Sequence, residues 1–185
     1  MALRVIAGSA GGRKLVAPKG GARPTTDRLK EALFSSLGAR VHDATVLDLY
    51  AGSGALAIEA LSRGAARAVV VDHDRASEAA VHANLATTGF DDVVRFQRSP
   101  VGPFLAAPVP EAPFDLVFLD PPYEMGSSEV AGVLTALAAN AIVAPGGTVV
   151  VERPKSGQSV TLPTGWGIEK ERAYGDTLLV VAHAG

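Results

Sequence analysis

The side chains best suited to chemistry lie in one short stretch, residues 118–123. There a carboxylate, two prolines and an aromatic ring follow an apolar run, in the order Phe118-Leu119-Asp120-Pro121-Pro122-Tyr123. Proline has no N–H group and favours an extended predecessor, so Asp120 is expected at a strand end with its side chain in the following crevice. The carboxylate and the proline carbonyls accept hydrogen bonds, and Tyr123 offers a flat ring. The pattern predicts a site for a planar, hydrogen-donating group such as a nucleobase amine.

A second stretch could bind a cofactor. It follows another apolar run and reads Asp48-Leu49-Tyr50-Ala51-Gly52-Ser53-Gly54-Ala55-Leu56-Ala57. Glycines let the backbone pass close to a ligand, and a helix that begins there offers free N–H groups. Asp72 comes twenty positions after Gly52, where a carboxylate can accept the hydroxyls of a ribose. The same spacing fits the dinucleotide-binding fingerprint, so a further residue must decide between the two ligands.

Asp48 favours S-adenosylmethionine. A pyrophosphate at the glycine turn would face this carboxylate, and like charges repel in a crevice. S-adenosylmethionine has no phosphate and carries a sulfonium and an ammonium, which a nearby negative charge suits. Turn, helix and distant acid together favour ligand binding over a plain strand-to-helix turn. Asp72 taken alone fits a solvated acid at a strand end equally well.

Methyl transfer to an exocyclic amine explains the first stretch. The lone pair of such a nitrogen is delocalised into the ring. If the Asp120 side chain and the Pro121 carbonyl accept its two N–H bonds, the pair is localised and aimed at the methyl group. Tyr123 could stack on the base, a contact worth roughly 1–3 kcal/mol. Positioning and electrostatics would then supply most of the rate. A rigid loop is the alternative, which the glycine turn upstream makes the weaker interpretation.

The elements that must position these residues alternate along the chain. Apolar strands are expected at 46–50, 68–72, 93–97, 114–119 and 147–152, and helices at 55–63, 75–87 and 130–139. This alternation predicts an α/β fold with a parallel sheet covered on both faces. Residues 168–174 and 177–182 flank Gly175-Asp176, which predicts an antiparallel hairpin at the end. The chain of 185 residues, 48% of them hydrophobic and 19% charged, fits one globular domain.

The N-terminal region differs in charge from the rest. Residues 1–40 hold eight basic and two acidic side chains, a net charge of +6, whereas residues 41–185 hold nine basic and seventeen acidic ones, a net charge of −8. A short hairpin is expected around Gly8–Gly12, followed by a helix that Thr25 or Thr26 caps and Gly38 ends. We therefore divide the chain into a basic extension, 1–40, packed on a catalytic body, 41–185. The charge indicates a polyanionic partner or simply a solvated terminus.

Composition excludes several classes of site. The absence of cysteine rules out disulfides and thiolate metal sites, and the four histidines lack the spacing of metal ligands, so we expect no metal. No apolar run is long enough to cross a membrane, and no signal-peptide core is present, so we expect a cytoplasmic protein. Nothing in the sequence requires more than a monomer.

The two chemical stretches together resemble the class I S-adenosylmethionine-dependent N-methyltransferases. Five further segments carry a closer resemblance. They are Arg4-Val5-Ile6-Ala7-Gly8, Gly12-Arg13-Lys14-Leu15, Arg23-Pro24-Thr25-Thr26-Asp27-Arg28, Glu31-Ala32-Leu33-Phe34 and Glu59-Ala60-Leu61-Ser62-Arg63. With them, nearly the whole chain resembles the bacterial 16S rRNA guanine-N2 methyltransferases that act on the guanine conventionally numbered 966. Generic methyltransferases lack this basic N-terminal signature.

The resemblance implies a Rossmann-like, seven-stranded, mostly parallel sheet with a reversed C-terminal strand, and a small ribosomal subunit as substrate. It implies catalytic roles for Asp120, Pro121, Pro122 and Tyr123. It implies cofactor contacts at Asp48, Tyr50, Ala51, Gly52, Ser53, Gly54, Asp72, His73 and Ser99, and 16S rRNA contacts at Arg4, Arg13, Lys14, Lys19 and Arg23. Two positions depart from the family: Asp72 replaces a glutamate, and Ser99 stands where an asparagine or aspartate commonly meets the adenine.

Four other functions fit parts of the sequence. N6-adenine methylation of DNA shares the Asp120–Tyr123 chemistry but normally needs a separate DNA-reading region. Glutamine methylation of a protein would leave the basic extension without a role. An NAD-binding oxidoreductase would share the glycine turn, and binding of NAD against S-adenosylmethionine separates the two. A non-catalytic RNA-binding factor would have no use for Asp120–Tyr123.

Overall fold

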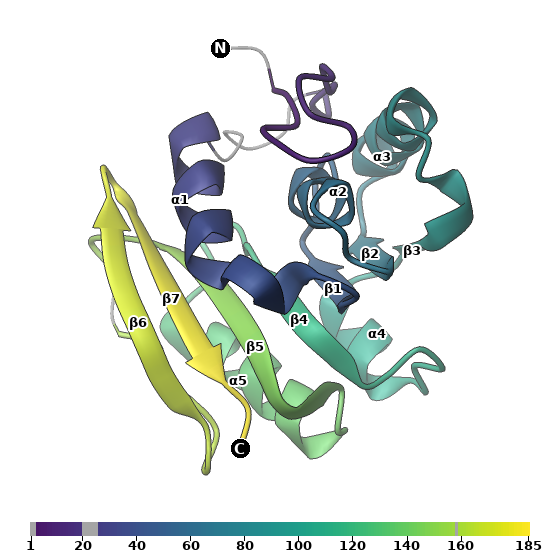
Figure 1. Ribbon diagram of the computed structural model, residues 1–185. Helices are drawn as coiled ribbons and strands as arrows, with labels where there is room; N and C mark the ends of the chain where they lie inside the picture. Colours follow the sequence, from purple (N-terminus) through teal and green to yellow (C-terminus); the bar gives the residue numbers. More distant parts are fainter. Residues whose placement is uncertain (1–2, 20–25, 158) are drawn as a thin grey trace.

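The computed structural model describes residues 3–19, 26–157 and 159–185. These residues form a seven-stranded sheet in the order β3-β2-β1-β4-β5-β7-β6 (Figure 1). The strands are β1 Thr45–Leu49, β2 Arg67–Asp72, β3 Val94–Arg98, β4 Phe114–Leu119, β5 Val143–Pro154, β6 Gly167–Tyr174 and β7 Thr177–His183. Strands β1 to β5 pair in parallel, and β7 runs antiparallel to both β5 and β6. The predicted parallel sheet with a reversed strand in a terminal hairpin is confirmed.

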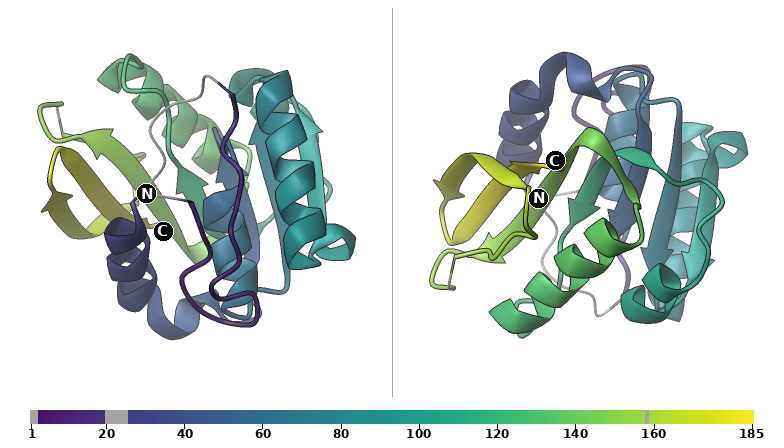
Figure 2. Two further views of the ribbon diagram at one scale, coloured as in Figure 1. Left: turned by 90° about the horizontal axis from the view of Figure 1, so that it is seen from above. Right: turned by 90° about the horizontal axis from the view of Figure 1, so that it is seen from below.

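Helices cover both faces of the sheet (Figure 2). They are α1 Asp27–Leu37, α2 Ala55–Ser62, α3 Arg75–Thr88, α4 Val101–Ala106 and α5 Ser127–Ala139, with 3-10 turns η1 Gly38–Val41 and η2 Asp91–Val93. Alternate strand residues point to opposite faces. Val46 and Phe118 pack with α1, α2 and α3, whereas Leu47 and Val117 pack with α4 and α5. Among the described residues, no helix is long and apolar enough to cross a membrane.

Four elements differ from the sequence-based expectation, in presence or in extent. Helix α4 lies in a Pro-rich connection where none was expected, because Gly102 and Pro103 hide its pattern; Pro103 falls in the first turn, whose N–H groups have no helical partner. Strand β5 extends the predicted strand at both ends, and α5 begins three residues early, at Ser127. Tyr50 leaves the predicted first strand, because it adopts a left-handed backbone with φ 61°.

The N-terminal segment, residues 3–19, packs on α2 and α3. The expected hairpin is reduced to one bridge between Arg4 and Lys14. Glu59 of α2 is fully buried, and its carboxylate accepts the backbone N–H groups of Ile6 (2.7 Å) and Ala7 (3.2 Å). A buried carboxylate requires such donors, so the segment is a fixed part of the fold and not a loose arm.

Helix α1 closes the same face. As predicted, Thr26 caps it, accepting the N–H of Leu29 (3.3 Å), and Gly38 ends it. Lys30 of α1 is completely buried, and its ammonium donates to the backbone carbonyl of Arg4. Burial lowers the pKa of Lys30. Helix α1 and the N-terminal segment are therefore packed against each other, and each helps to fix the position of the other.

Candidate functional site

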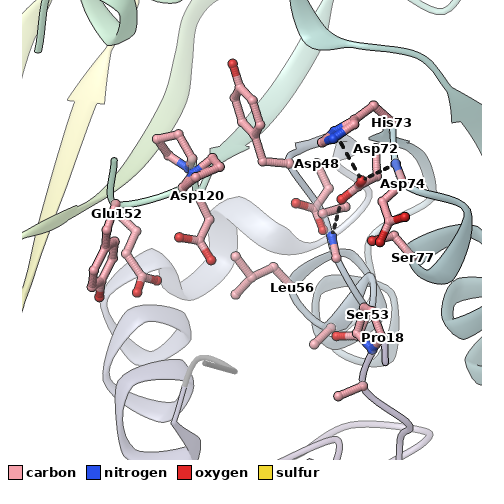
Figure 3. Close-up of a pocket in the computed structure, with 18 of the residues that line it drawn as sticks. Pro18, Asp48, Ser53, Leu56, Asp72, His73, Asp74, Ser77, Asp120 and Glu152 are labelled. Atoms are coloured by element: carbon pink, nitrogen blue, oxygen red, sulfur yellow. Dashed lines mark hydrogen bonds and ion pairs between the residues drawn. The ribbon is translucent and has the colours of Figure 1, made fainter. Parts of the chain in front are cut away.

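A cavity of about 370 Å³ opens at the carboxyl ends of β1, β2, β4 and β5 (Figure 3). This is the edge where an open parallel sheet binds ligands, and the strand order reverses here between β1 and β4. Eleven of the predicted site residues line it, namely Asp48, Tyr50, Ala51, Gly52, Ser53, Asp72, His73, Asp120, Pro121, Pro122 and Tyr123. The structure thus brings together two stretches that lie some seventy positions apart in the sequence.

The glycine turn has the backbone that glycine allows. Gly52 and Gly54 adopt left-handed conformations, with φ 56° and 72°. Gly54 does not line the cavity; it precedes α2, and a Cβ atom there would approach the Val81 side chain to 3.3 Å. Tyr50 shares the left-handed backbone without being glycine, a strained conformation of the kind found at functional sites.

Asp48 is a buried acid with an incomplete hydrogen-bond set. Its side chain lies below the glycine turn, and the residue is 1% exposed. One oxygen, Oδ2, accepts the N–H of Ala57 (3.1 Å) at the start of α2, while Oδ1 has no hydrogen-bond partner among the described residues. Burial raises the pKa of Asp48 to about 8, and the nearby charges of Asp120 and Asp72 add to the effect. A cation in the cavity would satisfy this carboxylate.

Asp72 joins the glycine turn to the end of β2. Its Oδ2 accepts the N–H of Gly52 (2.8 Å), and its Oδ1 accepts the N–H of Asp74 (2.9 Å). Each carboxylate oxygen can accept a second hydrogen bond, so the side chain can still receive ribose hydroxyls. His73 follows at the rim, with Nδ1 3.7 Å from Oδ1 of Asp72.

Asp120 ends β4 on the other side of the cavity. Its backbone N–H donates to the carbonyl of Leu49 (3.4 Å), and burial raises the pKa of its carboxyl to about 7. Pro121 is buried behind it, while Tyr123 is 50% exposed at the mouth. The Tyr123 hydroxyl contacts Oγ1 of Thr177 (3.0 Å), which anchors the far end of the ring on β7.

Several lining residues were not among the predicted site residues. They are Leu3, Ala17, Pro18, Ala55, Leu56, Asp74, Ser77, Glu124 and Glu152. The N-terminal ones reach the cavity because Asn84 of α3 holds them there. Asn84 accepts the N–H of Val16 (2.7 Å) and donates to the carbonyls of Val16 and Ser53 (both 2.9 Å). One buried amide therefore ties the N-terminal segment to the glycine turn, across 68 and 31 residues of sequence.

Ser99 and the basic residues lie elsewhere. Ser99 is not among the described residues that line the cavity; its hydroxyl donates to the carbonyl of Pro100 (3.0 Å). The predicted RNA contacts in the described range are all exposed: Arg4, Arg13, Lys14 and Lys19. Arg4 pairs with Asp27 (2.8 Å), and Arg13 donates to the carbonyl of Thr87. Arg23 falls outside the described residues.

The cavity is strongly acidic. Six carboxylates line it, and its described lining holds no lysine or arginine: the acids are Asp48, Asp72, Asp74, Asp120, Glu124 and Glu152. A pyrophosphate would be repelled here, whereas a nucleoside with cationic groups would lower the repulsion among the acids. The unpartnered Oδ1 of Asp48 and the strand-end Asp72 fit S-adenosylmethionine, and the acidity disfavours NAD.

Comparison with known proteins agrees with this geometry. A relative in Escherichia coli (strain K12), named Ribosomal RNA small subunit methyltransferase D, is 38% identical over 174 residues, which cover 94% of this chain and 85% of the relative. The solved structure of the Escherichia coli protein yhhF has a TM-score of 0.89 and 34% identity, covering 100% of this chain and 98% of that one.

More distant structures share the fold. An RNA methyltransferase from Salinibacter ruber, solved with S-adenosyl-L-homocysteine, has a TM-score of 0.63 at 19% identity, covering 87% of this chain and 93% of that one. The fold is therefore the Rossmann-like fold of these methyltransferases. The family described as Conserved hypothetical protein 95 matches residues 3–183. The chain belongs to that family.

Proposed function

We propose that this protein transfers the methyl group of S-adenosylmethionine to the exocyclic N2 of a guanine in 16S rRNA of the small ribosomal subunit, in the cytoplasm. The observation that carries the proposal is the position of Asp120 at the end of β4, in one acid-lined cavity with the glycine turn. The name of the Escherichia coli relative and the shared fold support the coarser statement, methylation of ribosomal RNA with S-adenosylmethionine.

Residues on the β1 and β2 side would hold the cofactor. Asp72 accepts the ribose hydroxyls, the backbone at Gly52 and Ser53 allows close approach, and the Asp48 carboxylate balances positive charge. When bound, S-adenosylmethionine supplies an electrophilic methyl group on a positively charged sulfur. Binding of this cation keeps Asp48 ionised at neutral pH, because its negative charge then has a partner.

Residues on the β4 side would hold the guanine. The Asp120 carboxylate and the Pro121 carbonyl accept the two N–H bonds of the amine, which localises the nitrogen lone pair and directs it at the methyl carbon. The nitrogen forms its new bond as the carbon–sulfur bond breaks, and it then loses one proton. Asp120 can take that proton or pass it to water, since its pKa of about 7 lies near the working pH. Tyr123 stacks on the base at the cavity mouth.

Mapping the methylated nucleotide tests the function directly. Small subunits from a strain that lacks the modification are incubated with the protein and tritiated S-adenosylmethionine. After nuclease digestion, mass spectrometry of the labelled fragment should give one N2-methylguanosine in 16S rRNA. Label in a protein glutamine, or label in N6-methyladenine when DNA is supplied in a parallel incubation, would instead favour one of the rival methyltransferase reactions.

The exposed lysines of the N-terminal segment provide a second test. Deleting residues 1–20 would also strip Leu3, Ala17 and Pro18 from the cavity wall, so neutralising charges is the cleaner experiment. The double variant Lys14→Gln, Lys19→Gln should bind RNA more weakly and reduce the slope of log K against log salt by about 1.4–1.8, the effect of two lost phosphate contacts. Its affinity for S-adenosylmethionine should not change.

Filter binding across a salt series measures that slope. Arg67→Gln is the control, because Arg67 is an exposed basic residue outside the N-terminal segment. It lies at the start of β2, at the end of the sheet away from the cavity. If the double variant bound RNA with the wild-type slope, the lysines would not contact phosphate, and the basic segment would serve only folding and the cavity wall.

A further inference from the structure

Glu152 is a carboxylate that has no role in the reaction proposed above. On sequence it resembles a surface acid at a strand end. In the structure it is only 8% exposed, lies on β5 and lines the cavity. Leu119 of β4 pairs with Val151 of β5, so the next residues of the two strands, Asp120 and Glu152, are neighbours. Figure 3 shows both carboxylates pointing into the cavity.

Two acceptors on adjacent strands match the edge of guanine. Neighbouring strands lie about 4.8 Å apart, so carboxylates from β4 and β5 can contact adjacent positions of one base. Guanine carries its N1–H donor directly beside the N2 amine. Adenine carries an acceptor, its unprotonated N1, beside the N6 amine. Asp120 alone accepts from either amine, and the group that faces N1 therefore decides which base is accepted.

We infer that Glu152 accepts the N1–H of the target guanine and so selects guanine over adenine. The inference rests on the proposed function, since it assumes that Asp120 holds the N2 amine. Against adenine, the Glu152 carboxylate would face the N1 lone pair in a buried site. A site built to accept a hydrogen bond from one group rejects an analogue that presents an acceptor there, because the two lone pairs repel in a buried site. Glu152 thus distinguishes guanine from adenine, which residues 120–123 alone do not.

The base 2-aminopurine tests this contact, because it keeps the 2-amino group but has an unprotonated N1. It also lacks O6, which affects every variant alike, so the change in preference between wild type and a Glu152 variant reports on the N1 contact. Small subunits are reconstituted with 16S rRNA that carries guanine or 2-aminopurine at the mapped position, and kcat/KM is measured on both. The wild-type protein should prefer guanine by about a hundredfold or more. In Glu152→Gln the amide can accept from N1–H or donate to N1, so the preference should fall at least tenfold. Glu152→Ala should lose activity on guanine without gaining any on 2-aminopurine.

Glu124→Gln is the matched control. It removes the same charge from the same cavity and should keep the wild-type preference between the two bases. Direct binding of S-adenosylmethionine to each variant reports on folding and on the cofactor side of the cavity. An unchanged preference in Glu152→Gln, or a loss of cofactor affinity as large as the loss of transfer, would overturn the inference. If the wild-type protein did not methylate guanine N2 at all, the proposed function itself would fail.

Discussion

Replacing Asp120 by asparagine or alanine is expected to reduce methyl transfer by about 10²–10⁴-fold, the usual contribution of a positioned acid–base or charge-stabilising group. The asparagine side chain has nearly the same shape, but it can present an N–H group to the amine. An amine nitrogen whose lone pair accepts this hydrogen bond cannot also donate the pair to the methyl carbon. Binding of S-adenosylmethionine should change by only a few fold, because Asp48, Asp72 and the glycine turn are untouched. Single-turnover transfer and calorimetric binding, measured on one preparation, separate the two effects.

The same strand offers a control for Asp120. Asp115 near the start of β4 is exposed, and its Oδ2 accepts the N–H of Thr45 (2.8 Å) far from the cavity. Asp115→Asn should transfer methyl groups at the wild-type rate. Wild-type transfer by Asp120→Asn would exclude the assigned role, whereas a joint loss of transfer and cofactor binding would place Asp120 in the cofactor site.

Replacing Asp48 by asparagine should have two opposite effects. In the folded protein without ligand, the pKa of Asp48 is about 8, against an ordinary value of 3.8. Between these pH values the folded state binds more protons than the unfolded state, so the free energy of unfolding decreases as pH rises. Asparagine removes this dependence and should stabilise the ligand-free protein near pH 8 by about 1–3 kcal/mol.

Cofactor binding should respond in the other direction. Asparagine cannot balance the sulfonium and ammonium charges, so S-adenosylmethionine should bind about 10–100-fold more weakly, corresponding to about 1.4–2.8 kcal/mol. In the wild-type protein, cation binding needs ionised Asp48, so affinity should fall by up to about tenfold per pH unit as the pH drops from about 8 to 6. The variant should lose most of that dependence.

Thermal unfolding and calorimetry between pH 6 and 8, with and without ligand, test both effects of Asp48→Asn. S-adenosylhomocysteine, which lacks the sulfonium charge, should lose less affinity than S-adenosylmethionine in the variant. Equal losses for the two ligands would show that Asp48 does not act on the sulfonium charge, because S-adenosylhomocysteine keeps only the ammonium.

Local patterns account for the parts of the site that could be predicted. Apolar runs and helix caps determine the alternating strands and helices, and parallel strands bring their carboxyl ends to one edge of the sheet. Asp48, Asp72 and Asp120 could therefore be placed together, because each lies within two residues of the end of a predicted strand. The glycine turn could be placed at the same edge of the sheet, because it directly follows a predicted strand.

Long-range contacts account for what could not be predicted. The N-terminal segment was expected to pack on the body, but its place in the cavity wall was not predicted; Glu59 and Asn84 hold it against α2 and α3, where it forms one wall of the cavity. Contacts of this kind join residues more than fifty positions apart, and the sequence pattern around either residue does not predict them.

The amino-acid sequence by itself determined the sheet, the glycine turn and the acid at the end of β4, because these follow from periodicity and turn chemistry within a few residues. Only the tertiary structure decided which acids share one cavity and how deeply each is buried. Burial is what raises the pKa of Asp48 and Asp120 and what separates Glu152 from an ordinary surface acid. It depends on the packing of whole helices and strands, so no single stretch of the sequence contains it.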